Sequence, residues 1–68
     1  MKPHERRAAN AAYYKLAVWD PRSFTFRDGK VAYAREADAR AAARKPGKYR
    51  VSVVPPDGRR QDLEPFTV

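Results

Sequence analysis

The absence of cysteine from a chain of only 68 residues is the feature that most limits how this protein can fold. A chain of this length buries only about 60% of its unfolded surface, and small domains often compensate with disulfides or a bound metal. Without cysteine, disulfides and thiolate metal sites are excluded. His4 is the single histidine, and structural zinc is not held by carboxylates around one imidazole. We therefore expect one domain that needs no cofactor or metal and is stabilised by packing or self-association.

The N-terminal segment differs in composition from the rest of the chain. Residues 1–12 are basic and rich in alanine, and they predict an arm or a short helix with Pro3 in its first turn. No apolar run follows the basic start, unlike a secretory signal, and no stretch approaches the ~20 apolar residues of a membrane span. Together with the lack of cysteine, this predicts a soluble cytoplasmic protein with one folded domain at residues 13–68.

An Asp-Gly pair between two alternating runs is the clearest local signal in the chain. Asp28-Gly29 separates residues 23–27 from residues 30–34. Asp-Gly is favoured in two-residue hairpin turns because both turn residues need positive φ. We therefore expect a hairpin there, with Phe24 and Phe26 buried on its core face.

The remaining segments complete the predicted fold. Alternation with period two predicts strands, and a run rich in alanine, glutamate and arginine predicts a helix whose apolar face is alanine alone. The predicted elements are strands at residues 13–19, 48–54 and 59–63 and a helix at residues 35–45. The fold class is therefore α+β. We expect one antiparallel sheet of four to five strands, with a single helix on one face, in the order strand, hairpin, helix, hairpin.

The register of the second hairpin is left open by the sequence. If a short loop joins the two strands, apolar positions of one strand pair with charged positions of the other. A register shifted by one residue, with a bulge, pairs Tyr49 with Leu63 and fits the alternation of apolar and polar residues better. Pro65 cannot donate to a ladder, so the last segment is an expected edge strand or tail. We expect Phe66 and Val68 to fold back onto the core.

Residues for catalysis are missing. The chain has one histidine, no cysteine, serine only at Ser23 and Ser52, and glycines that stand alone in turns. Neither a nucleophile with its base nor a phosphate-binding loop can be assembled from these residues. Asp62 and Glu64 lie beside two arginines, which predicts surface ion pairs rather than an acid/base pair. We expect a protein that is not an enzyme and takes no small-molecule substrate.

The charge balance provides the main functional hypothesis. Lysine and arginine number 15 against 8 acidic residues, a net charge of +7. Such a balance favours a polyanion partner, most often nucleic acid, bound through phosphate contacts that do not read sequence. The alternative is that a GC-rich genome adds arginine and alanine without selection for binding. The candidate nucleic-acid-binding residues lie in the second half of the chain: Arg44, Lys45, Lys48, Arg50, Arg59 and Arg60. Of these, Arg59 and Arg60 flank the loop apex and are expected to reach outward.

A second candidate surface lies on the first predicted strand. Tyr13, Lys15 and Trp19 share one face, and aromatic rings interleaved with a cation can stack bases or form a protein interface. The alternative is that the helix or the N-terminal arm covers this face and makes Trp19 part of the core. The predicted function is a nucleic-acid-binding module, with a protein-interaction module or accessory subunit as the alternative.

Overall fold

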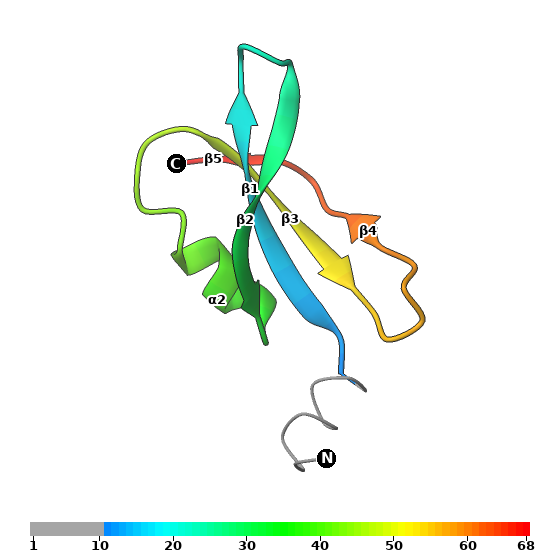
Figure 1. The fold of residues 1–68 in the computed structure, drawn as a ribbon. Helices are drawn as coiled ribbons and strands as arrows, with labels where there is room; N and C mark the ends of the chain where they lie inside the picture. Colours follow the sequence, from blue (N-terminus) through cyan, green and yellow to red (C-terminus); the bar gives the residue numbers. More distant parts are fainter. Residues whose placement is uncertain (1–10) are drawn as a thin grey trace.

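A computed structural model describes residues 11–68 as a five-stranded antiparallel sheet with one short helix (Figure 1). The elements are, in chain order, β1 (Tyr13–Asp20), β2 (Thr25–Tyr33), α2 (Glu36–Ala41), β3 (Lys48–Val54), β4 (Gln61–Asp62) and β5 (Phe66–Thr67). The strand order is β2-β1-β3-β4, and β5 also pairs with β3. The predicted α+β class is confirmed. Most of the predicted arm at residues 1–12 lies outside the described residues. Within residues 11–68, no helix has the length and apolar character needed to span a bilayer.

The predicted turn at Asp28-Gly29 is wrong. β2 runs through both residues, and the chain turns instead at residues 21–24, between β1 and β2. A register shift leaves Leu16 of β1 opposite residues 29–31 of β2, so the pair marks a bulge. Gly29 does not have positive φ. An added Cβ there would lie 3.3 Å from the Leu16 carbonyl oxygen, so glycine permits a close backbone approach.

The corrected register changes where the two phenylalanines lie. Phe26 pairs with Trp19 across β1 and β2 and is half-buried. Phe24 lies in the turn and is 81% exposed, so its predicted burial is wrong. The physical reason is that a turn residue has no neighbouring strand to cover it.

The core lies between α2 and one face of the sheet. Ala39 and Ala43 are buried there, with Tyr49 and Val51 from β3. Both alanines belong to the predicted alanine face, although the helix ends at Ala41, earlier than predicted. The chain leaves the helix early because the residues that follow must reach the start of β3 at Lys48.

The C-terminal segment follows the free edge of β3. β4 pairs Ser52 with Asp62, so the predicted pairing of Tyr49 with Leu63 is wrong. Leu63 instead donates its backbone N–H to the Val51 carbonyl at 2.9 Å. This register places the Asp62 carboxylate beside the Ser52 hydroxyl, which donates to it at 2.6 Å.

The last residues close the aromatic part of the core. Phe66 pairs with Tyr49 and stacks on it with ring centroids 5.9 Å apart, which confirms that Phe66 folds back. The guanidinium of Arg40 on α2 lies 4.9 Å from the centroid of the Phe66 ring, so helix and tail lie on the same sheet face. Val68 is half exposed, and its backbone forms two hydrogen bonds with Gly47.

Candidate nucleic-acid interface

The sheet face opposite α2 is termed the open face, because no helix or strand among residues 11–68 packs on it (Figure 1). Successive strand residues point to opposite faces, so the register determines which side chains share this face. The basic residues predicted on β3 and the aromatic face predicted on β1 therefore meet. The open face carries Tyr13, Lys15, Ala17, Trp19, Phe26, Asp28, Lys48, Arg50, Ser52 and Asp62.

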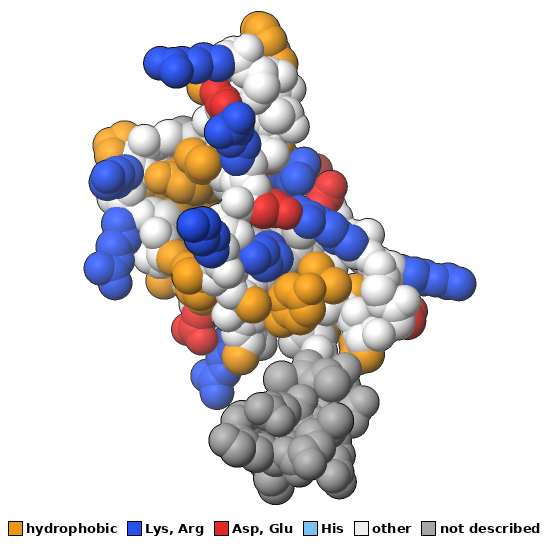
Figure 2. All heavy atoms as spheres, viewed as in Figure 1, with side chains coloured by type: hydrophobic (Ala, Val, Ile, Leu, Met, Phe, Trp, Pro, Cys, Tyr) orange, Lys and Arg blue, Asp and Glu red, His pale blue; other side chains and the backbone are white. Residues whose placement is uncertain are grey.

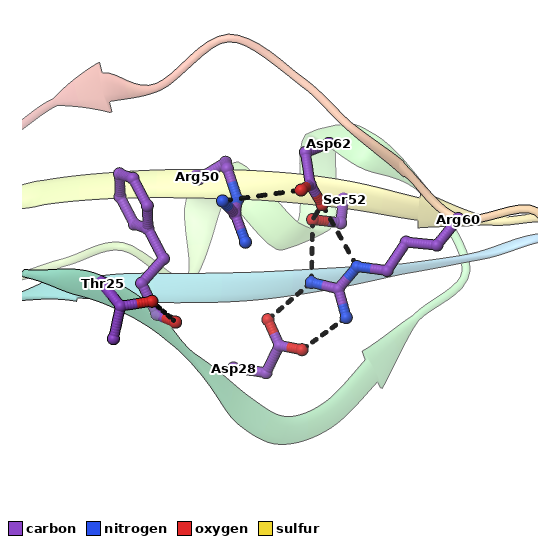
Figure 3. A network of polar contacts seen from close by, with 7 residues as sticks. Thr25, Asp28, Arg50, Ser52, Arg60 and Asp62 are labelled. Carbon is purple, nitrogen blue, oxygen red and sulfur yellow. Dashed lines mark hydrogen bonds and ion pairs between the residues drawn. The ribbon is translucent and has the colours of Figure 1, made fainter.

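Five side chains form an ion-pair network across the middle of the open face (Figure 3). Arg60, from the loop before β4, donates to both carboxylate oxygens of Asp28 on β2, at 2.6 and 2.8 Å. It also donates to Asp62 at 3.2 Å and to the Ser52 hydroxyl at 3.0 Å. Arg50 lies 3.5 Å from the second oxygen of Asp62. This ion-pair network links the two edges of the sheet, and it confirms the predicted ion pairing of Asp62.

Ala17 lies beneath the ion-pair network. It pairs with Asp28 on one side and with Arg50 on the other, and it is fully buried although no helix in the described part of the chain lies over it. Arg60 contacts side chains of β2 and of β3, so its guanidinium must cross β1, which lies between them. A methyl group at position 17 leaves room for that crossing.

The ion-pair network lowers the pKa values of its two carboxyl groups. Hydrogen bonds from Arg60 are the main cause of the lowered pKa of Asp28, and burial opposes them. The pKa of Asp62 is lowered first by the hydrogen bond from Ser52 and then by Arg60. Both carboxylates are therefore charged at neutral pH and offset the charge of Arg60. The expectation that Arg60 reaches outward is wrong, because its charge is already matched within the sheet.

Three aromatic rings, termed the aromatic end, lie where the β1–β2 hairpin turns. Trp19 makes edge-to-face contacts with Phe26, at a centroid distance of 5.1 Å, and with Phe24, at 6.2 Å. The Lys48 ammonium lies 5.4 Å from the centroid of the Trp19 ring, and the Arg50 guanidinium 4.7 Å from that of Phe26. Trp19 is half-buried beside these neighbours, and the expectation that the helix covers it is wrong, because α2 packs on the other face of the sheet. The other expected cover, the N-terminal arm, lies largely outside the described residues.

The other predicted binding residues lie away from the aromatic end. Arg44 and Lys45 are exposed in the segment that follows α2. Arg59 is exposed in the loop before β4, where its backbone N–H donates to Asp57. Tyr13 is exposed at the far end of β1. The structure therefore gathers only part of the predicted set. Lys15, Trp19, Lys48, Arg50 and Arg60 lie together on or over the open face, and Tyr13 lies on the same face but at the opposite end of β1 from Trp19.

The sequence pattern does not place two residues of the aromatic end, Phe24 and Phe26, in a binding site. It predicts both in the core, because Asp28-Gly29 has the chemistry of a hairpin turn. The only sequence feature that indicates their position is their spacing from Trp19, which suits a strand, a turn and a returning strand.

In the space-filling view, acidic and basic side chains lie side by side across the middle of the molecule, apart from several apolar patches (Figure 2).

Comparison with known proteins does not identify this interface: no family model matches the chain, and no curated protein sequence or solved structure is significantly similar to it. Within residues 11–68, no three His, Cys, Asp or Glu side chains are grouped closely enough to hold a metal ion.

Proposed function

We propose that this protein is a non-catalytic nucleic-acid-binding module and that the aromatic end is its binding site. The observation that supports the proposal is the position of Lys48 and Arg50 over the rings of Trp19 and Phe26, at 5.4 and 4.7 Å. Rings and cations interleaved on a sheet face on which no helix of residues 11–68 packs suit a ligand that has both flat bases and phosphates. Nucleic acid is the polymer with both.

The distribution of charge supports the same partner. All five ion pairs among residues 11–68 use an arginine and none uses a lysine. Lys48 is exposed and lies on the aromatic end, and Arg22 is exposed in the same turn as Phe24. With a net charge of +7, the molecule attracts polyanions from a distance.

A protein-interaction module is the second candidate, because exposed aromatic rings also form protein interfaces. The two candidates differ in how the binding affinity depends on salt concentration. Binding through phosphates releases counterions and weakens steeply as salt rises, whereas an interface formed by aromatic rings does not depend on salt in this way.

The test is a fluorescence-anisotropy titration of labelled DNA and RNA oligonucleotides at several salt concentrations. We expect weak, sequence-tolerant binding, and we expect Lys48→Gln to weaken it. Arg35→Gln is the matched control, because Arg35 is an exposed cation at the start of α2, on the other side of the sheet. Absence of binding by the parent protein at low salt would reject the proposed function and favour a protein partner.

A further inference from the structure

We infer that Phe24 is a stacking surface for an unpaired base, so that the preferred ligand of the aromatic end is single-stranded nucleic acid. The inference rests on the proposed function and deepens it by naming the class of nucleic acid. It starts from the backbone of Phe24, which has a φ of 53°. Among residues 11–68, no other non-glycine residue has positive φ.

Phe24 combines two unfavourable features at one position. A bulky residue is strained at positive φ, where glycine or asparagine is the usual choice in a turn. Its side chain is also left in water, because the residue is 81% exposed. Folding alone would favour a small or polar residue at this position. A strained residue that also exposes a large apolar side chain is typical of a functional site.

The cations over the neighbouring rings indicate which ring is free to stack. Lys48 lies over Trp19 and Arg50 lies over Phe26, so these two rings already have a charged group at one face. No cation within residues 11–68 lies over Phe24 in this way. The plane of its ring makes an angle of 75° with that of Trp19, in an edge contact that leaves much of the ring uncovered. Phe24 therefore offers an open ring surface, and the neighbouring cations can contact phosphates on either side.

This arrangement favours an unpaired strand over a duplex. In a duplex each base is already stacked and paired, so its flat face is not available to a protein ring. In a single strand the bases can turn outward and stack on aromatic side chains without regard to sequence. The phosphates of either form can contact Lys48, so the difference between the two forms depends on Phe24.

The inference is tested with Phe24→Gly, which removes the ring and relieves the strain, and Phe24→Tyr, which keeps a ring. The probes are a fluorescently labelled oligothymidine and a labelled duplex of equal length. Quenching of the fluorescence of Trp19, the single tryptophan, gives a second readout. The matched control is Val31→Ala, since Val31 is an exposed apolar residue on β2.

We expect the parent to bind the single strand more tightly than the duplex and to show quenching of Trp19. Phe24→Gly should lose roughly tenfold in single-strand affinity or more. It should keep its duplex affinity and unfold at a higher urea concentration than the parent. Phe24→Tyr and Val31→Ala should bind like the parent.

Three results would overturn the inference, and they are distinguishable. Equal affinity for both probes, with no effect of Phe24→Gly, would overturn the stacking role and leave nucleic-acid binding in place. Absence of binding to either probe at low salt would overturn the proposed function together with the inference. Loss of single-strand affinity in Phe24→Tyr as well as in Phe24→Gly would show that the ring itself is not what binds.

Discussion

Arg60 connects more of the fold than its place in a surface loop suggests. Its guanidinium joins Asp28 on β2 to Asp62 on β4, and it holds the loop before β4 against the sheet. Single exposed ion pairs contribute about 0–1 kcal/mol, but a bidentate pair within a network has fixed geometry and contributes more. At the residue scale, the ion-pair network is therefore a stabilising contact of the sheet.

The network predicts how stability depends on pH. The pKa of Asp28 is lower in the folded protein than its unfolded value of about 3.9, so its contribution is complete above that value. As the pH falls through the folded pKa, this contribution is lost. We expect the urea midpoint, followed by circular dichroism, to fall between pH 5 and pH 2.5. The fall should be smaller in the Asp28→Asn variant. This variant is less stable than the parent at pH 7, but it has no carboxylate at position 28 that acid can neutralise. Parallel pH profiles for the two proteins would contradict the role assigned to the network.

The same residues show why local sequence was insufficient here. Asp28-Gly29 has the chemistry of a turn, but a bulge in a long strand also accommodates glycine, and only pairing with β1 distinguishes the two. The positive φ of Phe24 follows from the turn that this pairing creates, so it could not be predicted from phenylalanine itself. The pairing of Arg60 with Asp28 joins residues 32 positions apart and leaves no periodic signal.

At the scale of elements, α2 depends on the sheet for its stability. A six-residue helix is too short to be stable alone, so it persists through the packing of its alanine face. Ala39 is fully buried against the sheet, while Ala37 on the same helix is exposed. Close packing therefore requires a small side chain at position 39 but not at position 37.

Two matched substitutions test this packing. Ala39→Leu adds volume to a close-packed contact and should destabilise the protein by about 1–3 kcal/mol. Ala37→Leu adds the same volume in solvent and should change stability by less than about 0.5 kcal/mol. Urea denaturation of the two variants and the parent measures both values. Equal effects of the two substitutions would show that α2 does not pack on the sheet through Ala39.

The long elements could be predicted and the short ones could not. β1 and β3 carry enough two-residue alternation to be recognised as strands and lie in the middle of the sheet, so their positions along the chain could be predicted. Burial follows the alternation less closely, because Ala17 is fully buried beneath the ion-pair network while Val18 is exposed. β4 and β5 have two residues each, too few for a pattern. Their register depends on side-chain contacts such as that between Ser52 and Asp62, which the sequence shows only after the strands are paired.

At the scale of the whole molecule, the net charge of +7 does not give the number of cationic side chains that are available to contact a partner. The arginines Arg27, Arg40, Arg50 and Arg60 are each matched with a carboxylate, so much of the arginine excess serves the fold. Lysines have no part in these ion pairs, and Lys48 is exposed at the start of β3, beside the aromatic end. The salt dependence of binding should therefore report on Lys48 more than on the paired arginines.

This division of charge gives a prediction about salt. On a single strand, each phosphate contact contributes about 0.7 to the slope of log K against log salt. Changing Lys48 to glutamine should lower that slope by up to about 0.7, with little change in the urea midpoint because the side chain is exposed. Arg60→Gln should do the opposite: the slope stays within error of the parent value, because Arg60 is not available to phosphate. The urea midpoint falls, because Asp28 loses its ion-pair partner and Asp62 loses one of its partners. Anisotropy titrations at four or more salt concentrations, with urea denaturation of the same samples, separate the two effects.

A slope that drops in Arg60→Gln as much as in the lysine variant would contradict this division of charge. It would mean that phosphate displaces Asp28 from Arg60, and the middle of the open face would then be part of the binding site.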